Sequence, residues 1–288
     1  ERYQEAMADY TQALALDVTN ARIYLHRAAT YYTQQRFELA LEDGEAAIHY
    51  GLGKTAKDAY DLCGRIYGLL DQYDLALKAL NQSLKLAPTD ANLWYSHGVT
   101  YQRMGKIHEA LADYSRAIEL DPNLLNAYLN RGVILLSLGF DERALADLNR
   151  AIELDPACGR AYLNRSSYYI KHKQYDNARA DCTNGIKLMK DGEQSKKQTF
   201  GFGSALYSQD LGILSSATAD ASLALAYHQR GLAEHGLAQY ARAIDDFKLA
   251  ITLEPQSAMV HEGLGDVYSS LGQSDAAVNH YNTVLDIN

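Results

Sequence analysis

A fixed spacing of proline motifs constrains this 288-residue chain more than any other feature. Leu120-Asp121-Pro122 is followed by Leu154-Asp155-Pro156, so that the two prolines are 34 residues apart, and Pro88 precedes the first by the same interval. A period near 34 residues is typical of a solenoid of helix–turn–helix units, in which each unit contacts only its neighbours. We therefore expect an extended helical repeat protein whose work is binding.

Other columns of residues recur at the same period. Aromatic residues and leucines return at helical spacing, which predicts the apolar faces of two short helices in each unit. Small residues stand where two helices cross, because only a small side chain allows a close approach, and Asp-Pro pairs end the second helix. One unit reads Trp94, His97, Gly98, Tyr101, Gly105, Ala110, Tyr114, Ala117 and Pro122, and the next reads Tyr128, Arg131, Gly132, Leu135, Gly139, Ala144, Leu148, Ala151 and Pro156.

This pattern resembles the tetratricopeptide repeat (TPR) family, and the resemblance covers nearly the whole chain. It implies an all-α, right-handed superhelical solenoid of helix–turn–helix repeats. Residues 193–223 break the period, and we expect there either an ordered insertion or a degenerate repeat that acts as a hinge or hook. The expected segments are the second helix of a truncated repeat at 1–20 and repeats at 21–56, 57–90, 91–124, 125–158, 159–192, 224–257 and 258–288. Both ends look cut, so we expect the chain to be part of a larger chain or complex.

Composition and charge argue against several classes of protein. The net charge of −9, without a basic stripe, argues against nucleic acid and anionic membranes as partners. The longest aliphatic run, around Val133 to Leu138, is too short to cross a membrane. Cys63, Cys158 and Cys182 lack metal-ligand spacing, and two of them fall in core columns. We therefore expect reduced, buried thiols and an intracellular, cytoplasmic protein.

Motifs that mimic chemical sites do not meet the full requirements of such sites. The segment from Gly51 to Thr55 is similar to the end of a phosphate-binding loop, but Ile48 stands where the first glycine is required, and the segment follows a helix. The nine histidines are scattered and form no HExxH motif. No nucleophile and base can be paired from spacing alone. We expect no enzymatic activity, no cofactor and no metal.

In TPR proteins the first helix of each repeat lines a concave groove, and the resemblance assigns the ligand contacts to fixed positions along it. Asn130 and Asn164 occupy the sixth position of adjacent repeats, where several peptide-binding TPR proteins hold an extended backbone with asparagines. An amide side chain offers both a donor and an acceptor. The expected groove residues are Asn130, Asn164, Arg160, Asn126, Tyr95, Val99, Leu129, Val133, Leu136, Leu163, Ile170 and Lys171. In the alternative interpretation, the leucines pack against neighbouring helices and the asparagines bond between repeats.

The apolar strip with basic margins predicts a hydrophobic peptide or an amphipathic helix with acidic residues as the ligand. The two-carboxylate clamp of co-chaperone TPR domains is matched only in part. Asn130 fits the required asparagine, and Arg160 approximates a required lysine. The remaining lysine, asparagine and arginine of the clamp are replaced by Tyr95, Val99 and Asn164. The predicted function is a non-enzymatic scaffold or adaptor for a protein or peptide within a larger complex. A substrate-recruiting arm of a larger enzyme, or an architectural rod that uses its convex face, stays open as an alternative.

Overall fold

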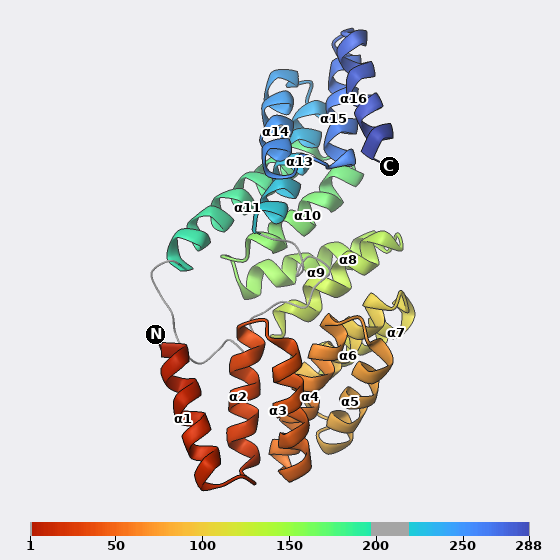
Figure 1. The fold of residues 1–288 in the computed structure, drawn as a ribbon. Coiled ribbons are helices and arrows are strands. Elements are labelled where there is room, and N and C mark those ends of the chain that lie inside the picture. The colour runs from red at the N-terminus through yellow and green to blue at the C-terminus, as the bar shows by residue number, and fades with distance from the viewer. Residues whose placement is uncertain (1, 197–218, 288) are drawn as a thin grey trace. The chain divides into compact units, whose positions relative to one another are not determined.

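The computed structural model describes residues 2–196 and 219–287. These two ranges contain fifteen helices and no strand, so the predicted all-α fold is confirmed (Figure 1). The chain divides into two compact units, and the division falls between Ala127 and Tyr128. We call the part before the division unit 1 and the part after it unit 2.

The helices are similar in length, apart from two longer ones beside residues 197–218. Unit 1 contains α1 (Arg2–Leu16), α2 (Ala21–Thr33), α3 (Phe37–Tyr50), α4 (Lys54–Leu69), α5 (Tyr73–Leu86), α6 (Ala91–Arg103) and α7 (Ile107–Leu120). The next helix, α8 (Leu125–Ser137), begins in unit 1 and continues into unit 2. Unit 2 further contains α9 (Asp141–Leu154), α10 (Gly159–Lys171), α11 (Tyr175–Lys196), α13 (Ala219–Gly236), α14 (Tyr240–Leu253), α15 (Ala258–Ser270) and α16 (Ser274–Ile287).

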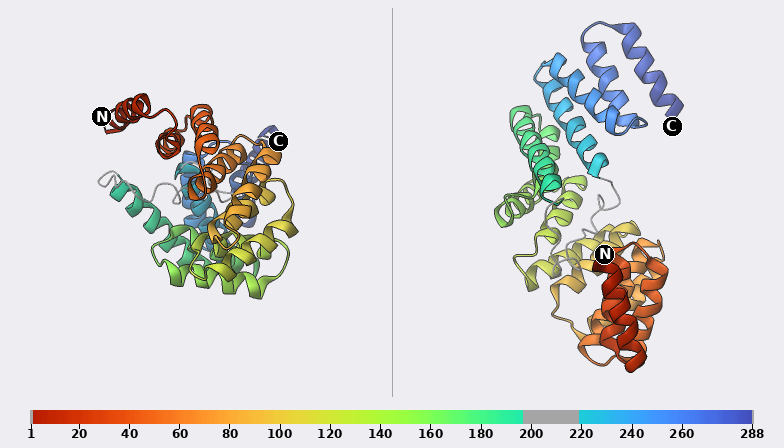
Figure 2. Two further views of the ribbon diagram at one scale, coloured as in Figure 1. Left: turned by 90° about the horizontal axis from the view of Figure 1, so that it is seen from below. Right: turned by 60° about the vertical axis from the view of Figure 1, so that its left-hand side comes forward.

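Each unit is a stack of helix pairs. In unit 1, α2 packs on α3, α4 on α5 and α6 on α7, while the first helices α2, α4 and α6 also contact one another in order. In unit 2, α10 packs on α11, α13 on α14 and α15 on α16; this last pair lies side by side in Figure 1 and in the right view of Figure 2. Because helices contact only those near them in the chain, each unit has the local connectivity of a solenoid.

Small residues allow the two helices of a pair to approach closely. A Cβ atom added to Gly98 of α6 would lie 2.9 Å from a ring carbon of Tyr114 on α7, so no larger residue fits there without a shift. On most of the second helices, the matching column holds a fully buried alanine. Its members with 0% exposure are Ala40, Ala76, Ala110, Ala144, Ala178 and Ala243. The small-residue columns of the sequence are therefore the crossing points of the helices.

The turn inside a helix pair uses a residue in the left-handed backbone region. Gly105, Gly139 and Gly272 have φ of 73°, 82° and 73°, directly after the residue that caps the first helix. Lys173 and Ala238 take the same position with φ of 56° and 57°. A left-handed residue after the cap reverses the chain and ends a helix, and glycine does so at the least steric cost.

The repeats on either side of residues 197–218 contact each other directly. Gln229 of α13 accepts a hydrogen bond from Ser166 of α10 at 2.9 Å and donates one to Ser167 at 2.7 Å. The helix pair α10–α11 therefore stacks on the pair α13–α14, although a long stretch of chain separates them. The insertion or degenerate repeat predicted at 193–223 lies largely outside the described residues.

Candidate protein-interaction site

The predicted groove residues fall on the first helices α6, α8 and α10. Tyr95 and Val99 lie on α6, and Asn126 lies at the start of α8, all three in unit 1. The other nine lie on α8 and α10 in unit 2. Unit 2 therefore holds most of the predicted surface, including the two asparagines on which the prediction depends.

Several of these side chains are buried. Leu129 is 0% exposed and Leu163 is 2% exposed, and Tyr95 and Val99 are buried as well. Leu163 belongs to a core cluster that also contains Phe247 of α14. These residues contribute to packing between helices and leave little surface for a ligand. Binding at the predicted groove remains a prediction.

The two asparagines of the sixth position differ in their surroundings. Asn130 is buried, with 6% exposure. Asn164 is only half-buried, and its side-chain amide has no hydrogen-bond partner among the residues that the structure describes. Val133, Leu136 and Ile170 are half-buried apolar residues on α8 and α10. An accessible amide and apolar side chains thus remain on the first helices of unit 2.

Lys171, predicted as a basic margin of the groove, forms an ion pair between repeats. Its ammonium group donates to Asp141 at 2.6 Å and to the carbonyl of Leu136 at 3.2 Å. His172 Nε2 also lies 2.9 Å from the Asp141 carboxylate. The hydrogen bond from Lys171 is the main reason that the pKa of Asp141 is lowered. These contacts connect the end of α10 to the first residue of α9.

A recurring ion pair joins the two helices inside most repeats, and the sequence reasoning missed it. The guanidinium of Arg131 on α8 donates to both oxygens of Asp147 on α9, at 2.7 and 2.8 Å. Arginine–carboxylate pairs with two parallel hydrogen bonds have a fixed geometry, and these hydrogen bonds are stronger than those between neutral groups. The equivalent pairs are Arg27–Asp43, Arg165–Asp181 and Arg230–Asp246, and in one further repeat His97 Nδ1 lies 2.7 Å from Asp113 at the same two positions. Their constant separation of 16 residues was a readable signal in the sequence.

The repeat at α4 and α5 replaces this pair with another buried ion pair. Cys63 and Ala79 occupy the positions that correspond to Arg131 and Asp147. Instead, the Asp61 carboxylate lies 3.3 Å from the Arg65 guanidinium one turn further along α4. The Arg65 guanidinium lies 5.5 Å from the centre of the Tyr32 ring. Burial raises the pKa of Asp61, and its Oδ1 accepts no hydrogen bond from any described residue.

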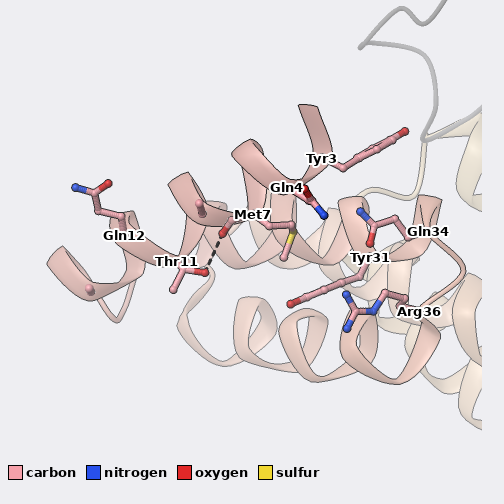
Figure 3. Close-up of a pocket in the computed structure, with 10 residues that line it drawn as sticks. Tyr3, Gln4, Met7, Thr11, Gln12, Tyr31, Gln34 and Arg36 are labelled. Atoms are coloured by element: carbon pink, nitrogen blue, oxygen red, sulfur yellow. Dashed lines mark hydrogen bonds between the residues drawn. The ribbon is translucent and has the colours of Figure 1, made fainter. Parts of the chain in front are cut away.

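Unit 1 also has an open cavity of about 860 Å³ between α1 and the end of α2 (Figure 3). Met7 and Tyr31 lie on opposite sides of it, and the Arg36 guanidinium lies 5.0 Å from the centre of the Tyr31 ring. The full lining is Tyr3, Gln4, Met7, Ala8, Thr11, Gln12, Ala15, Tyr31, Gln34 and Arg36. The lining combines apolar side chains with three glutamine amides, a mixture that is common at binding surfaces.

Neither a metal site with three or more protein ligands nor a membrane-spanning helix is found in the described ranges. No group of three or more His, Cys, Asp or Glu side chains there is arranged to hold a metal ion. Among the helices of residues 2–196 and 219–287, none combines the length and the apolar character needed to cross a membrane.

Comparison with known families identifies the repeats. The family described as "TPR repeat" matches residues 1–35, 64–105 and 104–139, and the one described as "Tetratricopeptide repeat" matches residues 125–158, 224–257 and 260–288. Together these matches cover more than half of the chain. The chain belongs to the TPR family, and its repeats make it a protein-interaction scaffold.

Relatives of known identity agree at the level of family and fold. A small glutamine-rich tetratricopeptide repeat-containing protein of Dictyostelium discoideum is 36% identical over 93 residues, which is 31% of this chain and 26% of the relative. The chain thus spans about a quarter of that relative's length.

Solved structures of low sequence identity share the fold. The APC/C hetero-tetramer Cut9–Hcn1 contains a chain with a TM-score of 0.72 and 18% identity, covering 99% of this chain and 50% of that one. A tetratricopeptide repeat protein from Parabacteroides merdae has a TM-score of 0.63 and 14% identity over 93% of both chains. Pseudomonas aeruginosa PilF has a TM-score of 0.59 and 17% identity, covering 78% of this chain and 88% of PilF.

Proposed function

We propose that this protein is a non-enzymatic cytoplasmic scaffold that holds a peptide segment or helix of a partner against α8 and α10 of unit 2. The observation that carries the proposal is the half-buried Asn164 amide, which has no hydrogen bond to any residue that the structure describes. A polar group in a partly apolar setting gains by pairing with a ligand. The buried thiols of Cys63 and Cys182 favour a reducing compartment.

The chemistry of the surface defines the ligand. Val133, Leu136 and Ile170 would contact apolar side chains, and Asn164 would exchange a donor and an acceptor with a backbone amide. Arg160, near the start of α10, adds positive charge and favours acidic residues beside the apolar ones. Since Lys171 already pairs with Asp141, we expect it to contribute little to recognition.

A peptide-display screen against the whole chain would test the proposal. Selected peptides would be measured by fluorescence anisotropy with the wild type, Asn164→Ala and Val133→Asp, after circular dichroism has verified the helix content of each variant. The loss of one or two hydrogen bonds predicts that Asn164→Ala binds about 5- to 10-fold more weakly. Val133→Asp should abolish binding, because it puts a charge into the apolar contact.

The matched control is Asn184→Ala, which removes an exposed amide from the second helix α11. It should leave the affinity unchanged. Peptides that bind Asn164→Ala and Val133→Asp as tightly as the wild type would disprove a site on α8 and α10 and would direct attention to other surfaces.

The proposal includes membership of a larger assembly. One chain with a similar fold occurs in the hetero-tetramer Cut9–Hcn1, together with other chains. We expect the protein to co-elute with its partner in size-exclusion chromatography of native extracts. Elution of all of it at the position of the isolated protein would contradict this part of the proposal.

A further inference from the structure

Two histidines meet between the helices α15 and α16. His261 Nδ1 of α15 lies 3.1 Å from His280 Nδ1 of α16, and both rings are half-buried and thus accessible from solvent. His280 occupies the column in which most other repeats carry the aspartate of the internal ion pair, and Leu264 stands in the matching arginine column. This repeat has therefore replaced the ion pair with a pair of imidazoles.

We propose that His261 and His280 form a binding site for a divalent late first-row metal ion, which joins α15 to α16. Imidazole nitrogens lie about 2.0–2.1 Å from such metals, so two of them in adjacent coordination positions are roughly 2.8–3.4 Å apart. The observed separation of 3.1 Å falls within this range. To share one ion, the two rings must turn so that both Nδ1 lone pairs converge on it.

Surrounding contacts prepare both rings for this role. His261 Nε2 lies 3.4 Å from the carbonyl of Pro255, which favours the tautomer with the proton on Nε2 and leaves the Nδ1 lone pair for a metal. A ring N–H that donates to a backbone carbonyl is the usual second contact of a metal-binding histidine. The Tyr268 ring stacks on His280 with an interplanar angle of 3°, which limits rotation of the imidazole.

The expected metal follows from the ligand set. Two imidazoles with water in the remaining positions suit Cu²⁺, Ni²⁺ or Zn²⁺, and the general order of affinities puts Cu²⁺ first. No further His, Cys, Asp or Glu of the described residues completes a three-residue group here. The affinity should therefore be that of a site with two protein ligands, well below that of a structural zinc site.

Isothermal titration of the whole chain with CuCl₂, NiCl₂ and ZnCl₂ would test the site. The wild type should bind one equivalent of Cu²⁺ more tightly than any further equivalents. His261→Asn and His280→Asn should each weaken this first equivalent by at least about tenfold, and the double variant should be no worse than either single one, because the ligands act as a unit. His108→Asn, which alters an exposed histidine of α7, should retain it.

Electron spin echo measurements on the wild type with one equivalent of Cu²⁺ would count the bound imidazoles without a variant. Two coordinated imidazoles are expected. Only one imidazole, an equal loss in His108→Asn, or a first equivalent that survives both single substitutions would overturn the site.

Discussion

The Asp147 carboxylate illustrates how single residues hold a repeat together. It is 5% exposed and accepts two hydrogen bonds from Arg131, so that it joins α8 to α9 at one point. A buried charge is tolerated only when it is paired, and removing one partner leaves the other with its full cost of desolvation. The same argument applies to Asp181 and Asp246 in the other repeats of unit 2.

Substitution Asp147→Ala should lower the free energy of unfolding by about 3–5 kcal/mol, because it leaves the Arg131 guanidinium without its buried partner. Urea unfolding followed by circular dichroism would measure the change. The matched control is Glu153→Gln on the same helix, which removes an ion pair with Arg150. The Glu153 side chain is 65% exposed. An exposed pair is worth at most about 1 kcal/mol, so equal effects of the two substitutions would contradict the role assigned to Asp147.

At the scale of elements, helix pairs depend on the places where two backbones approach. Two buried glycines of unit 1 differ sharply in this respect. A Cβ on Gly98 would lie 2.9 Å from the Tyr114 ring and 3.1 Å from the Asp113 Cβ, whereas a Cβ on Gly68 would meet nothing closer than 3.9 Å. Alanine raises the helix propensity at both positions, but only at Gly98 would its methyl group collide with a neighbouring helix. A comparison of the two substitutions therefore distinguishes the effect of crowding from that of helix propensity.

Gly98→Ala should destabilise the protein by about 1–3 kcal/mol, since α6 and α7 must move apart. Gly68→Ala, near the end of α4, should be neutral or stabilising by up to about 1 kcal/mol, because alanine favours the helix and has room. Thermal unfolding of both variants would provide the comparison. Stabilisation by both substitutions would show that the crossing of α6 and α7 tolerates a methyl group.

On the scale of the whole molecule, short-range contacts imply that stability is local. Phe247 of α14 is fully buried, and its ring lies against Gly231 of α13 and Gly263 of α15. Phe247 therefore packs α13, α14 and α15 of unit 2 against one another. In a solenoid, where each repeat contacts only its neighbours, loss of such a residue should loosen its surroundings rather than the entire chain.

Hydrogen exchange of Phe247→Ala should show faster exchange in α13, α14 and α15, with a local loss of about 3–5 kcal/mol. Exchange in α2 to α5 of unit 1 should remain as in the wild type. Leu249→Ala, which truncates an exposed side chain of the same helix, serves as the control. Equal acceleration throughout unit 1 would mean that the chain unfolds as one cooperative body.

Much of the fold was predictable because it repeats at short range. The columns of Gly98 and Ala110 mark the helix crossings, and the Asp-Pro spacing supplied the period on which the TPR fold was predicted. The column of Arg131 and the column of Asp147 are equally periodic, and their opposite charges at a constant separation are enough to predict the internal ion pairs. The predicted groove was harder, because a position in a repeat does not fix how much of a side chain is exposed.

The sequence by itself determined the family, the alternation of helices and the packed columns, since these depend on residues close together in the chain and recur in each unit. Only the tertiary structure decided which members of a column are accessible. Asn130 and Asn164 share one position of the repeat, yet the first is buried and the second is only half-buried. Likewise, Lys171 pairs with Asp141, and His261 meets His280. Exposure and pairing depend on side chains from neighbouring helices, so they are fixed only when the helices have packed.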